Sequence, residues 1–161
     1  MHIAPLDDRE IVMTRVLHAP RGHIFDAWTK PELLKRWLLG PPGWSMIQCD
    51  VDLKVGGGFR FVWRNRDGTK FGMRGVYHEI VRPERLVHTE VFDEDWTGGE
   101  TLVTTILTEQ NSGTGLKSTV RYSSRQARDK VLDSGMEQGV RASYDRLDEL
   151  LAVSEEREDR E

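Results

Sequence analysis

The sequence predicts an α+β domain in which a curved antiparallel β-sheet wraps around one long C-terminal helix. Three observations predict this fold class: period-two hydrophobic patterning through the middle of the chain, one long amphipathic stripe near its end, and a strand with two short helical segments at its beginning. The expected order is strand, two helices, six strands and one long helix. We expect one domain over residues 1–152, followed by a charged tail over 153–161 that frays.

Local signals define the N-terminal elements. Residues 1–9 carry no clear pattern and are expected to form a loose lead-in. Residues 11–17 are rich in β-branched side chains, which favour a strand. Pro20 and Pro31 fit the first turns of two short helices, and the Gly-Pro-Pro-Gly run at 40–43 ends the second helix.

Six strands are expected in the middle of the chain, because alternating apolar residues are separated there by turns rich in Gly, Pro, Asp and Asn. Their expected ranges are 45–53, 58–65, 70–81, 85–92, 100–109 and 115–123. Short strands spaced by such turns predict an antiparallel meander. A short helical segment is expected around 125–132.

The long helix is predicted over residues 134–152. Ser134 and Glu137 fit a capping box, and Glu137 and Arg141 fit an exposed i,i+4 ion pair. An apolar stripe at helical spacing consists of Met136, Val140, Tyr144, Leu147 and Leu151. Because the apolar face of a sheet needs a cover, we expect this stripe to pack on the concave face, with a small-molecule cavity at one end of the contact.

Composition excludes several classes of protein. The net charge of the 161-residue chain is −4, so no nucleic-acid partner is expected. Cys49 is the single cysteine, which excludes a disulfide scaffold and a Cys-rich zinc module. No apolar run reaches the ~18 residues of a membrane span. No signal peptide is visible, so a cytoplasmic location is expected.

Motifs for catalysis or cofactor binding are missing. No serine has the G-x-S-x-G context of a nucleophile, and the five histidines lack the spacing of a metal site. The triple glycine at 56–58 has no phosphate-loop lysine after it, and it is expected to be a tight bend. The sequence therefore predicts no catalytic residue, no metal and no cofactor.

A candidate pocket follows from strand pairing. If the strands around the turn at 82–84 pair symmetrically, His78 lies opposite His88, and a two-residue turn at 67–68 continues the same face onto the next strand. An apolar wall with a few convergent polar groups is typical of a small-molecule pocket. The ligand-binding residues predicted on this face are Phe61, Trp63, Arg74, Val76, His78, His88 and Glu90.

Two features of this prediction depend on the pairing. Arg74 and Glu90 lie diagonally across two strands and are expected to form a buried pair, while the two histidines are expected to titrate near neutrality if water reaches them. A one-residue slip would exchange the two faces of the sheet, and Arg74, His78 and His88 would then face solvent.

Four further residues complete the predicted site, namely Trp37, Met136, Val140 and Tyr144. Each of them has an alternative interpretation as ordinary core.

Several segments of the chain, in this order and spacing, resemble a known family. They are Ile24 to Thr29, Pro31 to Trp37, Gly57 to Phe61, Gly75 to Val87, and Ser134 to Met136. The pattern, which extends over about residues 11–152, resembles the family homologous to the activator of the heat-shock protein 90 ATPase, within the START-like (SRPBCC) superfamily. The resemblance implies a helix-grip fold of order β-α-α-β6-α, with a cavity between the sheet and the long helix.

The resemblance implies three functions that the residues alone do not separate, because one fold serves several functions. The first is a non-enzymatic protein that binds a hydrophobic or amphipathic small molecule in the cavity. The second is a co-chaperone-like module that contacts a protein partner and stimulates an ATPase. The third is a polyketide cyclase or aromatase in which Arg74, His78, His88 and Glu90 move protons.

Overall fold

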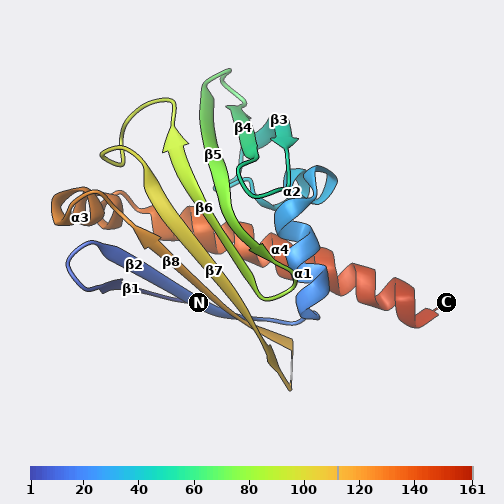
Figure 1. The fold of residues 1–161 in the computed structure, drawn as a ribbon. Coiled ribbons are helices and arrows are strands. Elements are labelled where there is room, and N and C mark those ends of the chain that lie inside the picture. Colours follow the sequence, from blue (N-terminus) through green and yellow to red (C-terminus); the bar gives the residue numbers. More distant parts are fainter. Residues whose placement is uncertain (112, 161) are drawn as a thin grey trace.

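The computed structural model describes residues 1–111 and 113–160, with side chains described as far as residue 152. The charged tail predicted over 153–161 lies outside the described side chains. Within the described residues the chain forms eight strands and four helices (Figure 1). They are β1 (His2–Leu6), β2 (Glu10–Leu17), α1 (Arg21–Thr29), α2 (Pro31–Trp37), β3 (Trp44–Val51), β4 (Gly58–Asn65), β5 (Lys70–Val81), β6 (Arg85–Phe92), β7 (Thr101–Gln110), β8 (Gly113–Arg121), α3 (Arg125–Asp133) and α4 (Met136–Arg160).

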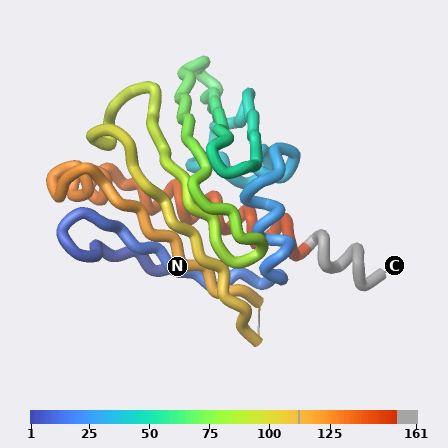
Figure 2. The backbone as a smooth tube through the Cα atoms, in the orientation of Figure 1, coloured from blue at the N-terminus to red at the C-terminus, as the bar shows by residue number. Residues whose placement is uncertain are grey.

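The strands form one antiparallel sheet in the order β1-β2-β8-β7-β6-β5-β4-β3. The sheet curves across α4, which runs along its concave side (Figure 1). α1 and α2 lie near the end of the sheet that β3 and β4 form, and α3 lies at the opposite end (Figure 2). The predicted α+β helix-grip fold is therefore confirmed.

The prediction of a loose N-terminal lead-in is wrong, because residues 2–6 form the edge strand β1. Pro5 lacks an amide hydrogen, and an edge strand tolerates that loss. Arg128 stabilises the turn between β1 and β2, because its guanidinium is buried and donates to the Glu10 carbonyl oxygen over 3.0 Å.

The apolar stripe of α4 packs against the sheet as predicted. Tyr144, Leu147 and Leu151 are buried in the larger hydrophobic cluster. Val140 is partly buried and touches both hydrophobic clusters, and Met136 packs against the smaller one. The half-buried positions thus lie toward one end of the helix, where the contact with the sheet is incomplete.

The predicted capping box is wrong. Ser134 closes α3 instead, because its amide and hydroxyl both donate to the Val131 carbonyl oxygen. Gly135 then turns the chain at a φ of +80°, which glycine adopts without strain. α4 begins at Met136. The predicted i,i+4 pair of Glu137 and Arg141 is present at 2.8 Å.

Candidate functional site

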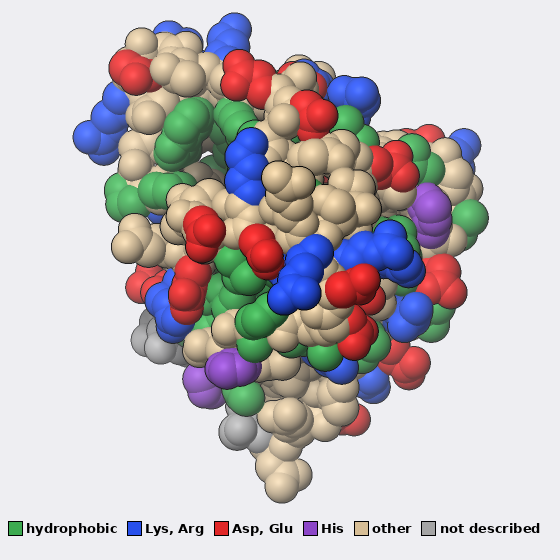
Figure 3. All heavy atoms as spheres, turned by 90° about the vertical axis from the view of Figure 1, so that its left-hand side faces the viewer, with side chains coloured by type: hydrophobic (Ala, Val, Ile, Leu, Met, Phe, Trp, Pro, Cys, Tyr) green, Lys and Arg blue, Asp and Glu red, His purple; other side chains and the backbone are tan. Residues whose placement is uncertain are grey.

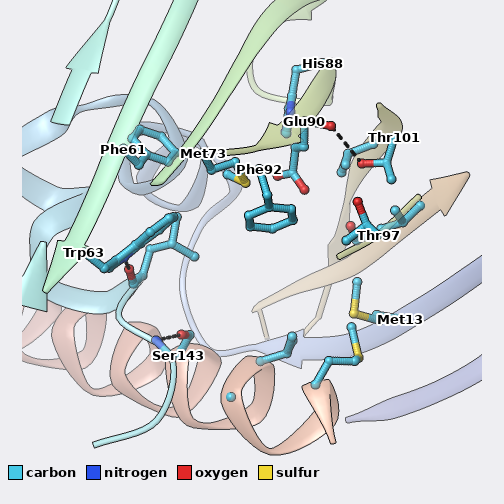
Figure 4. A pocket seen from close by; sticks show the side chains of 18 of the residues that line it. Met13, Phe61, Trp63, Met73, His88, Glu90, Phe92, Thr97, Thr101 and Ser143 are labelled. Carbon is cyan, nitrogen blue, oxygen red and sulfur yellow. Dashed lines mark hydrogen bonds between the residues drawn. The ribbon is translucent and has the colours of Figure 1, made fainter. Parts of the chain in front are cut away.

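A pocket of about 530 Å³ lies between the concave face of the sheet and α4. Its walls come mainly from β4 to β8, from α4, and from the loop between α2 and β3. Figure 4 looks into this pocket, and Figure 3 shows a hollow bordered by hydrophobic side chains on one face of the molecule. A space of this size with apolar walls suits a small organic molecule.

A row of aromatic rings forms one wall of the pocket. Neighbouring ring centroids lie between 4.7 and 6.2 Å apart along Phe59, Phe61, Trp63, Phe71, Phe92 and Trp96. These rings meet because alternate residues of β4, β5 and β6 point to one face. Gly75 makes room for the row, since a Cβ atom there would lie 2.4 Å from Phe59 Cζ.

The loop between α2 and β3 closes one side of the pocket and is held from two directions. From the sheet, Trp63 Nε1 donates to the Leu38 carbonyl oxygen over 2.7 Å. From α4, Ser143 Oγ accepts from the Gly40 amide over 2.9 Å, and Arg146 donates to the Gly40 carbonyl oxygen over 2.7 Å. The loop is therefore a fixed part of the wall.

Of the side chains that the structure describes, Glu90 is the one acidic group in the pocket lining. Its carboxylate points into the pocket beside Phe92 (Figure 4). Among the described residues no side chain forms a hydrogen bond or ion pair with this carboxylate; the Thr101 hydroxyl donates to the main-chain oxygen of Glu90 instead. Burial raises the pKa of Glu90 from 4.5 to about 7. Its charge state therefore changes near neutral pH.

His88 also lines the pocket, but it is neutral. Its Nδ1 lies 3.2 Å from the Thr89 carbonyl oxygen, and a carbonyl only accepts, so Nδ1 carries the hydrogen and Nε2 is an acceptor. The pKa of His88 is lowered to about 4: burial is the main cause, the hydrogen bond to Thr89 opposes it, and the nearby His78 acts in the same direction as burial. Titration near neutrality was expected of a hydrated ring, whereas His88 is desolvated, which disfavours its charged form.

Hydroxyl groups supply the remaining polarity. Tyr122 and Tyr144 have a raised pKa because they are buried and because the charge of Glu90 acts on both hydroxyls. Both tyrosines are therefore protonated donors that lie near the carboxylate. Thr105 and Ser118 are cross-strand partners on β7 and β8, and both line the pocket.

The structure brings seven of the eleven predicted site residues to this pocket. They are Phe61, Trp63, His88, Glu90, Met136, Val140 and Tyr144. Trp37 does not line it. Trp37 is fully buried, donates from Nε1 to the Ala27 carbonyl oxygen over 2.8 Å, and packs at 4.5 Å against Trp28, which does line the pocket. Trp37 thus supports the wall from behind.

Arg74, Val76 and His78 are exposed on the opposite face of the sheet, so their predicted place in the pocket is wrong. The symmetric pairing holds only close to the turn, where Glu79 lies opposite Val87. A β-bulge leaves His78 unpaired, and beyond it the register shifts by one residue. Such a shift exchanges the faces of the strand.

The β4–β5 register also differs from the prediction by one residue, because Phe61 lies opposite Met73 instead of Arg74. The predicted pair of Arg74 and Glu90 is therefore absent. Arg74 lies 3.7 Å from Asp93 on the outer face, where Asp93 also binds Arg60 at 2.6 Å.

Several pocket residues carried no recognisable signal in the sequence. Trp96 lies in the loop before β7 and belongs to no periodic pattern. Tyr122 continues the alternation of the strand predicted over 115–123, but it was not among the predicted site residues. Gly139 lies inside the predicted long helix, where glycine is unfavourable, and this was the sequence feature that could have indicated a close contact at this position. A Cβ atom there would lie 3.3 Å from Pro41 Cδ, so the glycine lets the loop lie close to α4.

The described residues contain neither a metal-binding cluster nor a membrane-spanning helix. No group of three or more His, Cys, Asp and Glu side chains among them is arranged to hold a metal ion. None of their helices is long and apolar enough to cross a membrane.

An eight-stranded antiparallel sheet that grips a C-terminal helix, with an apolar pocket between them, defines a START-like (SRPBCC) helix-grip protein. Residues 18–152 match the family described as Activator of Hsp90 ATPase homolog 1-like protein, and the chain belongs to this family.

Solved structures agree with this assignment. A protein from Rhodobacter sphaeroides has 35% sequence identity and a TM-score of 0.89, over 94% of this chain and 98% of that one. A protein from Nitrosomonas europaea has 26% identity and a TM-score of 0.82, over 93% and 99% of the two chains. A protein from Mycobacterium smegmatis, at 23% identity and a TM-score of 0.81 over 94% and 96%, shares the fold. No curated protein matches the sequence.

Proposed function

We propose that this protein binds a small hydrophobic molecule in the pocket between the sheet and α4. The observation that supports the proposal is the lining itself, since aromatic and aliphatic side chains surround a space of about 530 Å³ that contains only a few polar groups. Ligand pockets of proteins have this composition and this range of volume.

Family membership is also compatible with a co-chaperone-like module that contacts a protein partner. Such a module needs a contiguous exposed surface rather than an internal space. Among the described residues, the large exposed apolar side chains are Leu6, Val16, Ile47, Leu53, Val55, Val76 and Val81, and they are distributed over β1, β2, β3, β5 and the loop after β3. The pocket is therefore the more specific feature.

Glu90 supports a second candidate, an enzyme that moves protons on a bound ligand, as a polyketide cyclase-like protein would. General acid–base catalysis is most effective when the pKa of the group is near the working pH, and the pKa of Glu90 is about 7. Mass spectrometry of the ligand before and after incubation with the protein separates the two candidates. A carrier returns the molecule unchanged.

A pair of matched variants tests ligand binding. The neutral dye Nile red should bind the parent protein with increased fluorescence. Val140→Trp fills the pocket from α4 and should weaken this binding at least tenfold, while Val76→Trp adds the same volume on the exposed outer face and should leave it unchanged. Equal binding to the parent and to Val140→Trp would contradict the proposal.

A further inference from the structure

We infer that the pocket selects a ring-bearing organic cation, an amphipathic amine whose ammonium group lies against Glu90. This inference rests on the proposed function, because it names the class of ligand that the same pocket takes. Its basis is that the described pocket lining contains a carboxylate but no cationic side chain.

The lining contains a carboxylate but no cation. No lysine or arginine among the described residues lines the pocket, and the one described histidine there, His88, is buried and neutral. Arg146 on α4 donates to the Gly40 carbonyl oxygen in the closing loop. Among the described residues of the lining, no cationic side chain therefore offsets a negative charge on Glu90.

An ionised carboxylate in apolar surroundings is costly unless a cation or several donors accompany it. A ligand ammonium supplies that cation, and Tyr122 and Tyr144 add neutral hydroxyl donors close by. A fatty acid or another carboxylate ligand would place a second negative charge near Glu90, and no cationic side chain among the described residues of the lining offsets either charge. The same chemistry thus favours amines and disfavours acids.

The aromatic wall suits the rest of such a ligand. Phe92 lies beside the Glu90 carboxylate (Figure 4), and its ring belongs to the row that continues to Phe71 and Trp96. Aromatic faces attract cations, and they stack with ring systems. A flat, ring-bearing body with one ammonium group therefore matches both the walls and the charge.

Binding of a cation should depend on pH through Glu90 alone. The groups that face it are Tyr122 directly after β8, Tyr144 from α4 and His88 from its own strand, and none of the three changes charge between pH 6 and pH 8. Since the pKa of Glu90 is about 7, the ionised fraction rises about tenfold over this range. The affinity for an ammonium ligand should rise by the same factor.

A matched series of probes tests the inference: 1-pyrenemethylamine, 1-pyrenemethanol and 1-pyrenecarboxylic acid, titrated into the protein with fluorescence detection. At pH 8 the amine should bind at least tenfold tighter than the alcohol, and the acid weakest. Between pH 6 and pH 8 the affinity for the amine should rise about tenfold, while that for the alcohol should change less than threefold.

Two variants separate local charge from the overall charge of the protein. Glu90→Gln should remove the preference for the amine over the alcohol, together with its pH dependence. Glu100→Gln makes the same change at an exposed residue outside the lining and should keep the preference. An equal loss in both variants would overturn the inference, because the amine would then be held by net charge.

The outcomes also distinguish the inference from the proposed function. If the alcohol or the acid binds as tightly as the amine, the choice of ligand class is wrong and the pocket remains a binding site. If none of the three probes binds the parent protein, the inference fails together with the proposed function.

Discussion

The carboxyl of Glu90 should make the folded protein less stable as the pH rises, and Glu90→Gln should remove this effect. In the unfolded chain a glutamate ionises near 4.5, whereas burial holds the pKa of Glu90 at about 7 in the folded state. Between these values the folded state binds more protons than the unfolded state. The free energy of unfolding therefore falls as the pH rises from about 4.5 to about 7, and it stays low above that range.

The size of the effect follows from the two pKa values. Each pH unit of difference corresponds to roughly 1.4 kcal/mol, so the full loss is about 3 kcal/mol. Glutamine has nearly the shape of the protonated carboxyl and does not ionise. Going from pH 4.5 to pH 8, the stability of Glu90→Gln should thus increase by up to about 3 kcal/mol relative to the parent.

The assay is urea unfolding at pH 4.5, 6 and 8, followed by circular dichroism. His88 acts in the opposite direction, because its pKa is lowered to about 4 and the folded state loses stability in acid. Both proteins contain His88, so the difference between them isolates Glu90. A difference in unfolding free energy that stays constant within about 0.5 kcal/mol across the three pH values would refute the reasoning.

Three other changes have defined outcomes. Leu147→Ala removes a fully buried side chain and should lower the free energy of unfolding by about 2–5 kcal/mol, whereas Val76→Ala on the exposed face should lower it by less than about 1 kcal/mol in the same urea titration. Ser143→Ala removes the acceptor of the Gly40 amide, and the dissociation constant for Nile red should rise several-fold with little change in the urea midpoint. His88→Gln should make the unfolding free energy less sensitive to acid between pH 6.5 and pH 4, which would be contradicted if both proteins lose the same stability over that range.

The parts of the fold that were predictable are those that a short stretch of chain determines. Leu147 and Leu151 follow Val140 at helical spacing, and the structure buries both against the sheet. Each strand of the meander is bounded by its own turn residues. β1 could not be predicted this way, since it is a short edge strand with a proline and depends on pairing with β2.

The candidate site was only partly predictable, because it depends on how strands pair. Glu90 and His88 both line the pocket as predicted, since every second residue of β6 from Leu86 to Phe92 faces it. His78 was misplaced, because the bulge that leaves it unpaired inserts one residue without any Gly or Pro to mark it. The contacts of Ser143 and Arg146 with the closing loop join segments more than 100 residues apart, and no local pattern reveals them.

The pocket draws on almost every element of the fold, from Met13 in β2 to Tyr144 in α4. Its walls therefore exist only when the whole domain is folded, and the unfolded chain has no comparable site. Any molecule that fills the pocket shifts the folding equilibrium of the entire domain, by about 2.7 kcal/mol when its concentration is 100 times the dissociation constant. The melting temperature consequently reports occupancy for any ligand that binds the folded state alone.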